Sequence, residues 1–289
     1  MTNEWSFKRW AVPLRARIVA RMRGEVFSRL VQMRWKRGRL RGKPHGLPAR
    51  LIVSLTSFPA RFPTLHLSLK CLLNQSVAPD AVILWLQDED QSRAPENVVA
   101  LQVAGLTIRT TNHTGPYCKI IPSLEAYPDA YIVTADDDVY YGRHWLEGLV
   151  REVHVGEREV VCHRAHGIRF NGEGLPLPYL DWEYEIQSPE LSRHVFPTGI
   201  GGVLYPPGIL HDDAMDRSVY HSLCPTADDV WLYWMAVRNG ATFRKIGRRF
   251  QPIYWPGSQR RSLSQVNVLN HGNDRQIRNL LARFGYPPP

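Results

Sequence analysis

Residues 131–141 read YIVTADDDVYY and place three consecutive aspartates directly behind a short apolar run. A run such as YIVT is typical of a strand that is buried on both faces. The carboxylates of Asp136, Asp137 and Asp138 would repel one another strongly if they were dry and unpaired. This strand end therefore predicts a site that receives a cation.

The chain before this strand alternates strand-like apolar runs with helical patterns. We predict strands over 51–57, 81–87, 106–111 and 130–134, and helices over 61–75 and 119–128. Continuous Val/Ile/Leu strands that alternate with helices indicate a mostly parallel sheet with helices on both faces. The sequence therefore predicts an α/β fold of the Rossmann-like kind.

The pattern beyond residue 150 is less regular. It is compatible with a strand over 158–170, a loop over 171–182, a glycine-containing segment over 198–208, a helix over 226–240 and a terminal helix over 274–285. The helix over 226–240 is the clearest of these elements, with Thr226 as its N-cap and Gly240 as its stop signal.

Positive charge is concentrated at the beginning of the chain. Residues 1–46 hold 13 Lys and Arg against 2 Asp and Glu, so that the remainder is slightly negative although the whole chain is +9. Apolar residues recur there at helical spacing, namely Leu14, Ile18, Met22, Val26 or Phe27, Leu30 and Val31. They predict a basic amphipathic helix that lies on an anionic membrane, packs on the next domain or binds nucleic acid.

Gly and Pro at 42–48 mark a boundary, so we expect an N-terminal extension over 1–46 and one domain over 47–289. The 44% apolar content is that of a globular protein. The four scattered cysteines fit neither a disulfide framework nor a zinc ribbon. No apolar run reaches the roughly 18 residues of a membrane span, and no signal peptide is recognisable. We expect a cytoplasmic protein, at most held at the inner face of the cell membrane.

The acidic triplet has a chemical and a structural interpretation. Along a strand, side chains at i and i+2 share a face, so Asp136 and Asp138 can converge. Two convergent carboxylates suit Mg²⁺ or Mn²⁺, which share their coordination with substrate phosphates. The structural alternative is a solvated acidic turn or a cap for a following helix over 142–150.

Several segments together carry a family resemblance. TADDDVYY (134–141), TGIGGVLYPPG (198–208) and CPTADDVWL (224–232) resemble GT-A-type nucleotide-sugar glycosyltransferases, and bacterial enzymes of surface-polysaccharide synthesis in particular. The similarity spans roughly residues 50–240. It implies a GT-A fold, a nucleotide-sugar donor, Mn²⁺ or Mg²⁺ on the donor's diphosphate, Asp138 as metal ligand, and Asp136 on the metal or the nucleoside.

The resemblance also assigns roles outside the triplet. It places Thr56, Ser57, Arg61, Lys119 and Asp137 near the nucleotide, His271 in the metal site, and Gly201 and Gly202 against a sugar. The residue types suit these tasks, since arginine can donate two hydrogen bonds to phosphate and glycine permits close backbone approach. Each also has a structural alternative as a surface charge, a loop histidine or a turn.

Asp228 and Asp229 open the helix predicted over 226–240. In inverting GT-A enzymes a carboxylate at such a position takes the proton from the acceptor hydroxyl, and Asp229 is the expected base. A helix N-terminus is expected to lower the pKa of a carboxyl, which would leave it permanently ionised. The alternative is a capping box formed by Thr226 and Asp229.

These features predict a metal-dependent glycosyltransferase that moves a sugar from a UDP-linked donor to a glycan or lipid-linked acceptor. Aspartyl phosphatase chemistry is less favoured because Tyr140 occupies the Thr/Val position of D-x-D-x-[TV]. A nucleotidyltransferase is less favoured because SLTSFPARF lacks a glycine-rich phosphate loop. A membrane-binding or nucleic-acid-binding module built on residues 1–46 is the non-enzymatic alternative.

Overall fold

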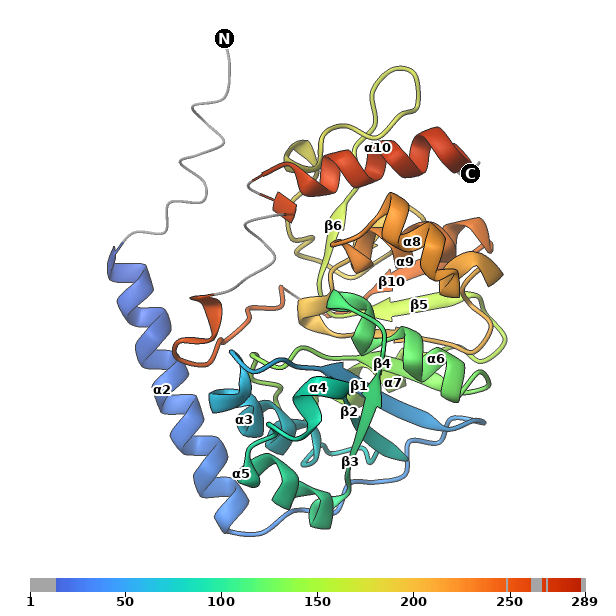
Figure 1. The fold of residues 1–289 in the computed structure, drawn as a ribbon. Coiled ribbons are helices and arrows are strands. Elements are labelled where there is room, and N and C mark those ends of the chain that lie inside the picture. The colour runs from blue at the N-terminus through green and yellow to red at the C-terminus, as the bar shows by residue number, and fades with distance from the viewer. Residues whose placement is uncertain (1–13, 248, 261–266, 269, 287–289) are drawn as a thin grey trace.

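An eight-stranded mixed sheet forms the centre of the protein. The computed structural model describes residues 14–247, 249–260, 267–268 and 270–286 (Figure 1). The strand order is β3-β2-β1-β4-β9-β5-β10-β7. The strands are β1 (Leu51–Thr56), β2 (Ala81–Gln87), β3 (Leu106–Thr111), β4 (Tyr131–Thr134), β5 (Glu159–Cys162), β7 (Glu190–Ser192), β9 (Val203–Tyr205) and β10 (Thr242–Lys245).

The first half of the sheet is parallel, as the sequence predicted. β1 pairs in parallel with β2 and β4, and β2 pairs in parallel with β3. From β1 the chain continues to β2 and β3 on one side of β1, and then crosses to β4 on the other side. The switch point of the sheet therefore lies between β1 and β4. Ligands of open α/β sheets bind at the carboxyl ends of strands at such a point.

The second half of the sheet departs from the predicted strands. β9 lies antiparallel between β4 and β5, and β10 pairs with both β5 and β7. The single strand considered over 158–170 is divided into β5 and β6 (Ala165–Gly167), and β6 pairs with β8 (Val195–Pro197) in a separate small sheet. The chain leaves the large sheet at Arg164, whose buried guanidinium turns toward Glu185.

Helices cover both faces of the sheet, which confirms the α/β class. They are α2 (Leu14–Lys36), α3 (Phe62–Leu72), α4 (Asp88–Gln91), α5 (Glu96–Val99), α6 (Ile121–Ala126), α7 (Trp145–Arg151), α8 (Arg217–Leu223), α9 (Asp228–Arg238) and α10 (Gly272–Phe284), with 3₁₀ turns η1 (Ala100–Ala104), η2 (Gly115–Lys119), η3 (Tyr179–Asp181), η4 (Gly199–Gly201), η5 (Asp212–Met215) and η6 (Ser258–Arg260). Leu51, Val53 and Leu55 pack on the side of α3 and α7. Ile52 packs on the side of α6 and α9.

Helix α2 divides its apolar residues between two sides, where the sequence predicted one amphipathic face. Val31 is buried in the cluster that contains α3, and the ring of Phe27 lies 4.6 Å from that of Tyr140. Ile18, Met22 and Val26 are exposed instead. The helical spacing predicted the helix but could not assign each residue to a side, because the apolar positions are spread over more than half of the helix circumference.

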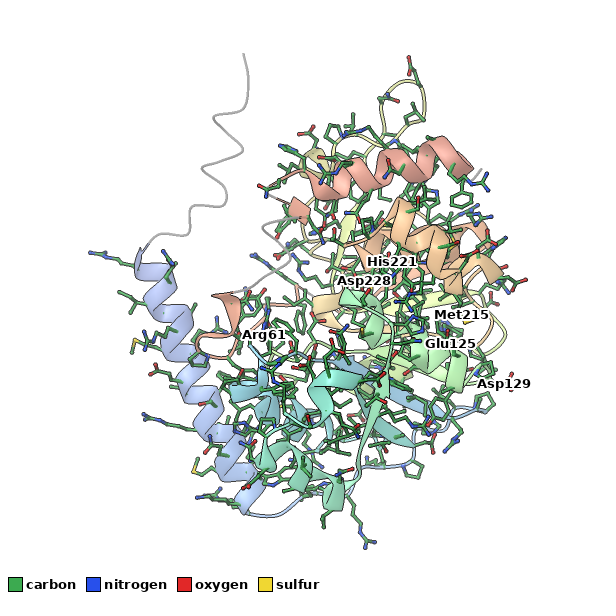
Figure 2. All side chains as sticks on the ribbon, in the orientation of Figure 1. Arg61, Glu125, Asp129, Met215, His221 and Asp228 are labelled. Atoms are coloured by element: carbon green, nitrogen blue, oxygen red, sulfur yellow. The ribbon has the colours of Figure 1, made fainter. Side chains whose placement is uncertain are left out.

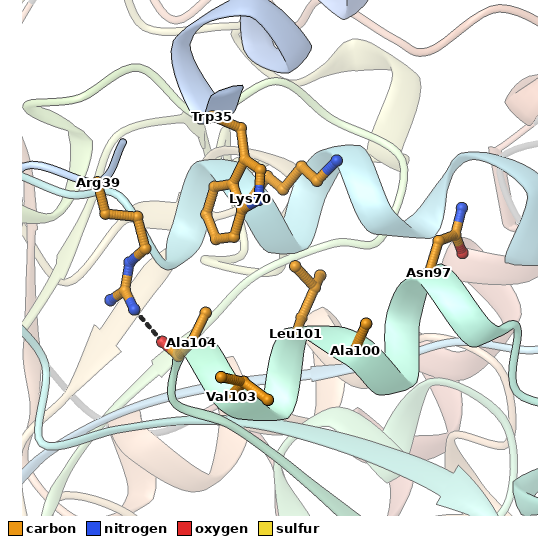
Figure 3. Close-up of a pocket in the computed structure, with 8 residues that line it drawn as sticks. All are labelled: Trp35, Arg39, Lys70, Asn97, Ala100, Leu101, Val103 and Ala104. Carbon is orange, nitrogen blue, oxygen red and sulfur yellow. Dashed lines mark hydrogen bonds between the residues drawn. The ribbon is translucent and has the colours of Figure 1, made fainter. Parts of the chain in front are cut away.

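A shallow hollow of about 510 Å³ lies where the end of α2 meets α3 and η1 (Figure 3). Trp35 lines it, with Lys70 Nζ 5.7 Å from the ring centroid and Arg39 Cζ 5.9 Å away. Arg39 also donates to the carbonyls of Leu73 and Ala104. The lining contains Arg39, Lys70 and Asn97 among apolar side chains, and it contains no carboxylate.

The four cysteines are free and buried. Burial raises the pKa of the Cys71 thiol to about 12 and that of Cys118 to about 11, and it raises the pKa values of Cys162 and Cys224 as well. In the part of the chain that the structure describes, no helix is long and apolar enough to span a bilayer.

Candidate functional site

A cavity of about 900 Å³ opens at the carboxyl ends of β1 and β4. Segments from both halves of the chain line it, and Arg61 and Asp228, one from each half, lie near the middle of the molecule (Figure 2). Nine of the site residues expected from the sequence line this cavity, namely Thr56, Ser57, Arg61, Lys119, Asp136, Asp137, Asp138, Asp228 and Asp229. The fold therefore brings together side chains that are more than 170 positions apart in the sequence.

The acidic triplet is held by side chains that follow β1. Ser57 Oγ donates to Asp137 Oδ2 at 2.6 Å. Arg61 donates to Asp138 Oδ2, and its guanidinium lies 3.6 Å from Asp137 Oδ1. Arg61 is thus a cation that balances the carboxylates, and a segment ahead of α3 supplies it.

Burial makes these carboxyl groups weaker acids than usual. It raises the pKa of Asp137 to about 7, with a further contribution from the negative charge of Asp138. The pKa of Asp138 is raised by burial too, although Arg61 opposes the shift. Burial acts against the charge of Arg61, but Asp138 and Asp137 raise its pKa above the usual value, so it stays protonated.

The donor chemistry of the triplet fits a hard divalent cation. Asp136 and Asp138 offer carboxylate oxygens beside the cavity, and two carboxylates are enough for an ion that completes its coordination with phosphates and water. Among the described residues, no cluster of three His, Cys, Asp or Glu side chains could hold an ion alone. A metal at Asp138 would also have to share that carboxylate with Arg61 and Gln259.

Lys119 joins the triplet to the second acidic pair. Its Nζ lies 2.9 Å from Asp228 Oδ2 and 3.4 Å from Asp136 Oδ1. Burial disfavours its charge, but Asp228 and Asp136 raise its pKa well above the usual value. Lys119 is therefore a fixed cation between the two acidic clusters.

Asp229 faces a different neighbour. Its Oδ2 accepts a hydrogen bond of 3.0 Å from the backbone N–H of Gly199. A Cβ added to Gly199 would lie 2.8 Å from Lys119 Nζ and 2.9 Å from Asp229 Oδ1, so only glycine leaves room for both. Gly199 was not expected from the sequence, although the GIGG run contains it.

The expectation that the helix lowers the pKa of Asp229 is wrong. Burial, followed by the charge of Asp228, raises the pKa of Asp229 to about 7, against the opposing effects of Lys119 and Gly199. Burial raises the pKa of Asp228 too. Desolvation of a packed carboxyl pair therefore outweighs the helix terminus.

The capping box is not how α9 begins. Its N-cap residue is Ala227, and the amides of Thr226 and Ala227 both donate to Gln276 Oε1 at 3.0 Å. The helix occupies 228–238, two residues shorter at each end than predicted. Gln276 of α10 therefore fixes the backbone just ahead of α9, and the Asp229 carboxylate, which accepts from Gly199, lines the cavity.

Three expected site residues lie outside the set of described residues that line the cavity. A Cβ on Gly201 would lie 2.8 Å from Arg164 Cβ, and one on Gly202 would lie 2.3 Å from the Trp145 ring, so close packing accounts for both glycines. His271 has an exposed ring, and its Nδ1 lies 3.2 Å from Asp274 Oδ2. Thr56 lines the cavity, but its hydroxyl donates to the carbonyl of Trp85.

The structure adds a polar wall that the sequence did not predict. Arg164 donates to Glu185 Oε1 at 2.9 Å and to Thr198 Oγ1 at 2.7 Å. The ring of Tyr184 stacks on that of His166 at 4.4 Å, and all of these residues line the cavity. Glu185 has φ of +57°, a strained value for a residue with a side chain. Arg164 and His166 lie in the run considered as a strand over 158–170, and nothing in that pattern indicated a cavity wall.

Comparison with solved structures finds partial likenesses. S. aureus TarS residues 1–349 align over 68% of this chain and 58% of that one, with 13% identity and a TM-score of 0.43. The 4-diphosphocytidyl-2C-methyl-D-erythritol synthase of Anaerococcus prevotii aligns over 78% and 99%, with 10% identity and a TM-score of 0.47. GalNAc-T7, in a structure with UDP, GalNAc and Mn²⁺, aligns over 68% and 42%, with 8% identity and a TM-score of 0.42.

No protein-family model and no curated protein matches the sequence. At these identities and scores the likenesses concern the path of the chain alone. The α/β assignment stands on the strand order and on the helices that cover both faces of the sheet.

Proposed function

We propose that this protein is a nucleotide-sugar-dependent glycosyltransferase. The observation that carries the proposal is the cavity at the switch point of the sheet, where the partly buried carboxyl of Asp229, with a pKa of about 7, faces the same space as an acidic triplet and the cations Arg61 and Lys119. Phosphate-binding cations and a carboxyl able to take up a proton near neutral pH are what transfer of a sugar to a hydroxyl requires.

The donor would lie along β1 and β4. Arg61 and Lys119 are the charged donors suited to a diphosphate, and Ser57 is the neighbouring hydroxyl. Asp136 and Asp138 would hold a Mg²⁺ or Mn²⁺ ion, which when bound neutralises charge on the departing nucleoside diphosphate. The phosphates would also provide a new partner for Arg61, which would leave Gln259 as the donor to Asp138 Oδ2.

The acceptor hydroxyl would approach Asp229. Its carboxylate takes the proton as the hydroxyl oxygen attacks the anomeric carbon and the bond to the diphosphate breaks, which inverts the configuration. The Gly199 amide keeps one Asp229 oxygen in place, and Lys119 holds the charge of Asp228 beside it. We propose a glycan or lipid-linked acceptor and a role in surface-polysaccharide synthesis.

The test is Asp229→Asn, which keeps the shape of the side chain but removes the base. We expect transfer from a nucleotide sugar to fall by about 10²-fold to 10⁴-fold, the range of general-base contributions. The matched control is Asp129→Asn, an exposed aspartate at the edge of the molecule (Figure 2), which should transfer at the wild-type rate.

A panel of UDP, GDP, CMP and dTDP compounds, with and without Mn²⁺, identifies the donor by its effect on Tm. Asp229→Asn should keep the stabilisation that the wild-type protein shows. Wild-type turnover by purified Asp229→Asn, or no stabilisation by any compound of the panel, would overturn the proposal.

Nucleotidyl transfer is the second candidate, because Arg61, Lys119 and the triplet would suit a triphosphate equally well. The two reactions differ in their products. A glycosyltransferase releases a nucleoside diphosphate or monophosphate from a nucleotide sugar, whereas a nucleotidyltransferase releases pyrophosphate from a nucleoside triphosphate. Asp229 favours the first, since an attacking phosphate needs no base.

A further inference from the structure

Helix α2 lies along one side of the molecule with a long face turned away from the sheet (Figure 1). Its inner side is fixed to the body by close contacts. Val31 is 6% exposed, and a Cβ on Gly24 would lie 2.5 Å from the carbonyl oxygen of Tyr254. The helix is therefore held in one orientation, so the same side chains always face away from the body of the protein.

The outer face carries a stripe of large apolar side chains. They are Ile18, Val19, Met22, Val26 and Met33, which are 51%, 55%, 60%, 61% and 50% exposed. At about 100° of rotation per residue, all five fall within an arc of about 100°, opposite the buried Gly24 and Val31. Ile18, Val19, Met22 and Val26 form an exposed apolar patch, and Met33 lies on the same side of the helix beyond Arg29. An exposed apolar patch of this kind marks an interaction surface.

Basic side chains flank this stripe and also lie within its arc, as Arg15, Arg29 and Lys36 do. The exposed basic residues of α2 are Arg15, Arg17, Arg21, Arg23, Arg29, Arg34 and Lys36, against a single acid, Glu25. Glu25 is paired with Arg21 at 3.2 Å. The helix thus carries +6 of the chain's net charge of +9, so most of the positive charge belongs to this surface.

We propose that the outer face of α2 binds an anionic lipid surface. Apolar side chains between arginines enter the boundary between headgroups and acyl chains, while the guanidinium groups stay among the phosphates. A second copy of this chain is disfavoured, because two such helices would bring like charges together. Nucleic acid is disfavoured because a phosphate backbone would leave the five apolar side chains in water.

The helix that carries the lipid-binding face packs, by its inner side, beside the cavity described above. Phe27 on the inner side packs against Tyr140, two positions beyond Asp138, and Gly24 packs against Tyr254, which lines the cavity. Binding to a bilayer would therefore hold the cavity beside it, where a lipid-linked acceptor is found. The binding itself does not rest on the proposed reaction.

The test measures sedimentation of the full chain with vesicles of phosphatidylcholine alone or mixed with phosphatidylglycerol. We expect binding to the mixed vesicles at low salt, and weaker binding at high salt, since the Debye length shortens from ~30 Å at 0.01 M to ~3 Å at 1 M. Val26→Asp removes an apolar contact and one unit of net positive charge, so it should weaken binding by about tenfold.

The matched control is Val155→Asp, the same change at a valine that is 65% exposed elsewhere on the surface. It should bind as the wild-type chain does, and so should Asp229→Asn. The proposal is overturned if the wild-type chain ignores phosphatidylglycerol vesicles at low salt. It is also overturned if both valine variants weaken binding equally, or if Val26→Asp instead abolishes a dimer in sedimentation velocity.

Discussion

Asp229 gives the molecule a dependence on pH that a surface aspartate would not. Its pKa of about 7 in the folded state exceeds the ordinary value of 3.8, so the folded state holds the proton more tightly. Its contribution to stability is complete below about pH 4 and is lost as the pH rises through about 7.

We therefore expect Asp229→Asn to gain stability relative to the wild-type protein from pH 5 to pH 8, by at most about 1.4 kcal/mol per pH unit. Over the same range wild-type transfer should rise with an apparent pKa near 7, because only the ionised carboxylate accepts the proton. Urea unfolding of both proteins at several pH values measures the first effect. A stability difference that stays constant across this range would contradict it.

At the scale of residues, the sequence predicted which groups meet better than it predicted their electrostatics. Ser57 lies in the cavity because it follows β1, and Asp228 because it opens α9. Lys119, which was expected to open a helix over 119–128, is the last residue of η2, and α6 begins two residues later. The sequence could not indicate that Arg61 would contact Asp138, since their contact depends on the turn before α3. The raised pKa of Asp229 depends on packing between distant segments, which no local pattern encodes.

At the scale of elements, two glycines of the turn η4 and its end have different roles, one in the site and one in the fold. Gly199 leaves room for Lys119 and Asp229, whereas Gly202 has φ of +88° and faces the ring of Trp145. We expect Gly199→Ala to lower transfer by about tenfold or more while the protein remains folded, because the displaced atoms belong to flexible side chains.

Gly202→Ala should instead destabilise the fold by about 1–3 kcal/mol, through its strained backbone and its clash with the ring. Gly208→Ala is the control, since Gly208 has φ of +65° but open space around it, which isolates the backbone cost. Urea unfolding and turnover should be measured for all three variants. Equal losses of stability in Gly199→Ala and Gly202→Ala would contradict this division.

The elements themselves were predictable where their pattern is local. The limits of β2 and β3 agree with the apolar runs at 81–87 and 106–111, because parallel strands buried on both faces are continuous in sequence. The strands β6 to β9 have three residues each, which is too few to show the apolar–polar alternation of a strand. Their pairing also depends on segments far away in the chain. The apolar spacing of α2 predicted a helix but not its second, outward stripe.

At the scale of the whole molecule, the switch between β1 and β4 explains why one cavity collects the charged residues. The parallel half supplies Ser57, Arg61 and the triplet, and the segments after β8 supply Gly199 and the Asp228–Asp229 pair. The two halves are joined across β4 and β9, so the spacing of the acidic clusters is set by the large sheet.

The rate at which the four cysteines react with a thiol reagent reports on whether the protein is folded. Cys71 lies on the α3 side of the sheet, Cys162 and Cys224 lie on the other side, and Cys118 alone borders the cavity. A thiol must ionise before it reacts, so a colorimetric disulfide reagent should modify three of them no faster than the chain unfolds. Cys118 should react first, and a bound nucleotide should slow it; rapid modification of all four without denaturant would refute this ordering.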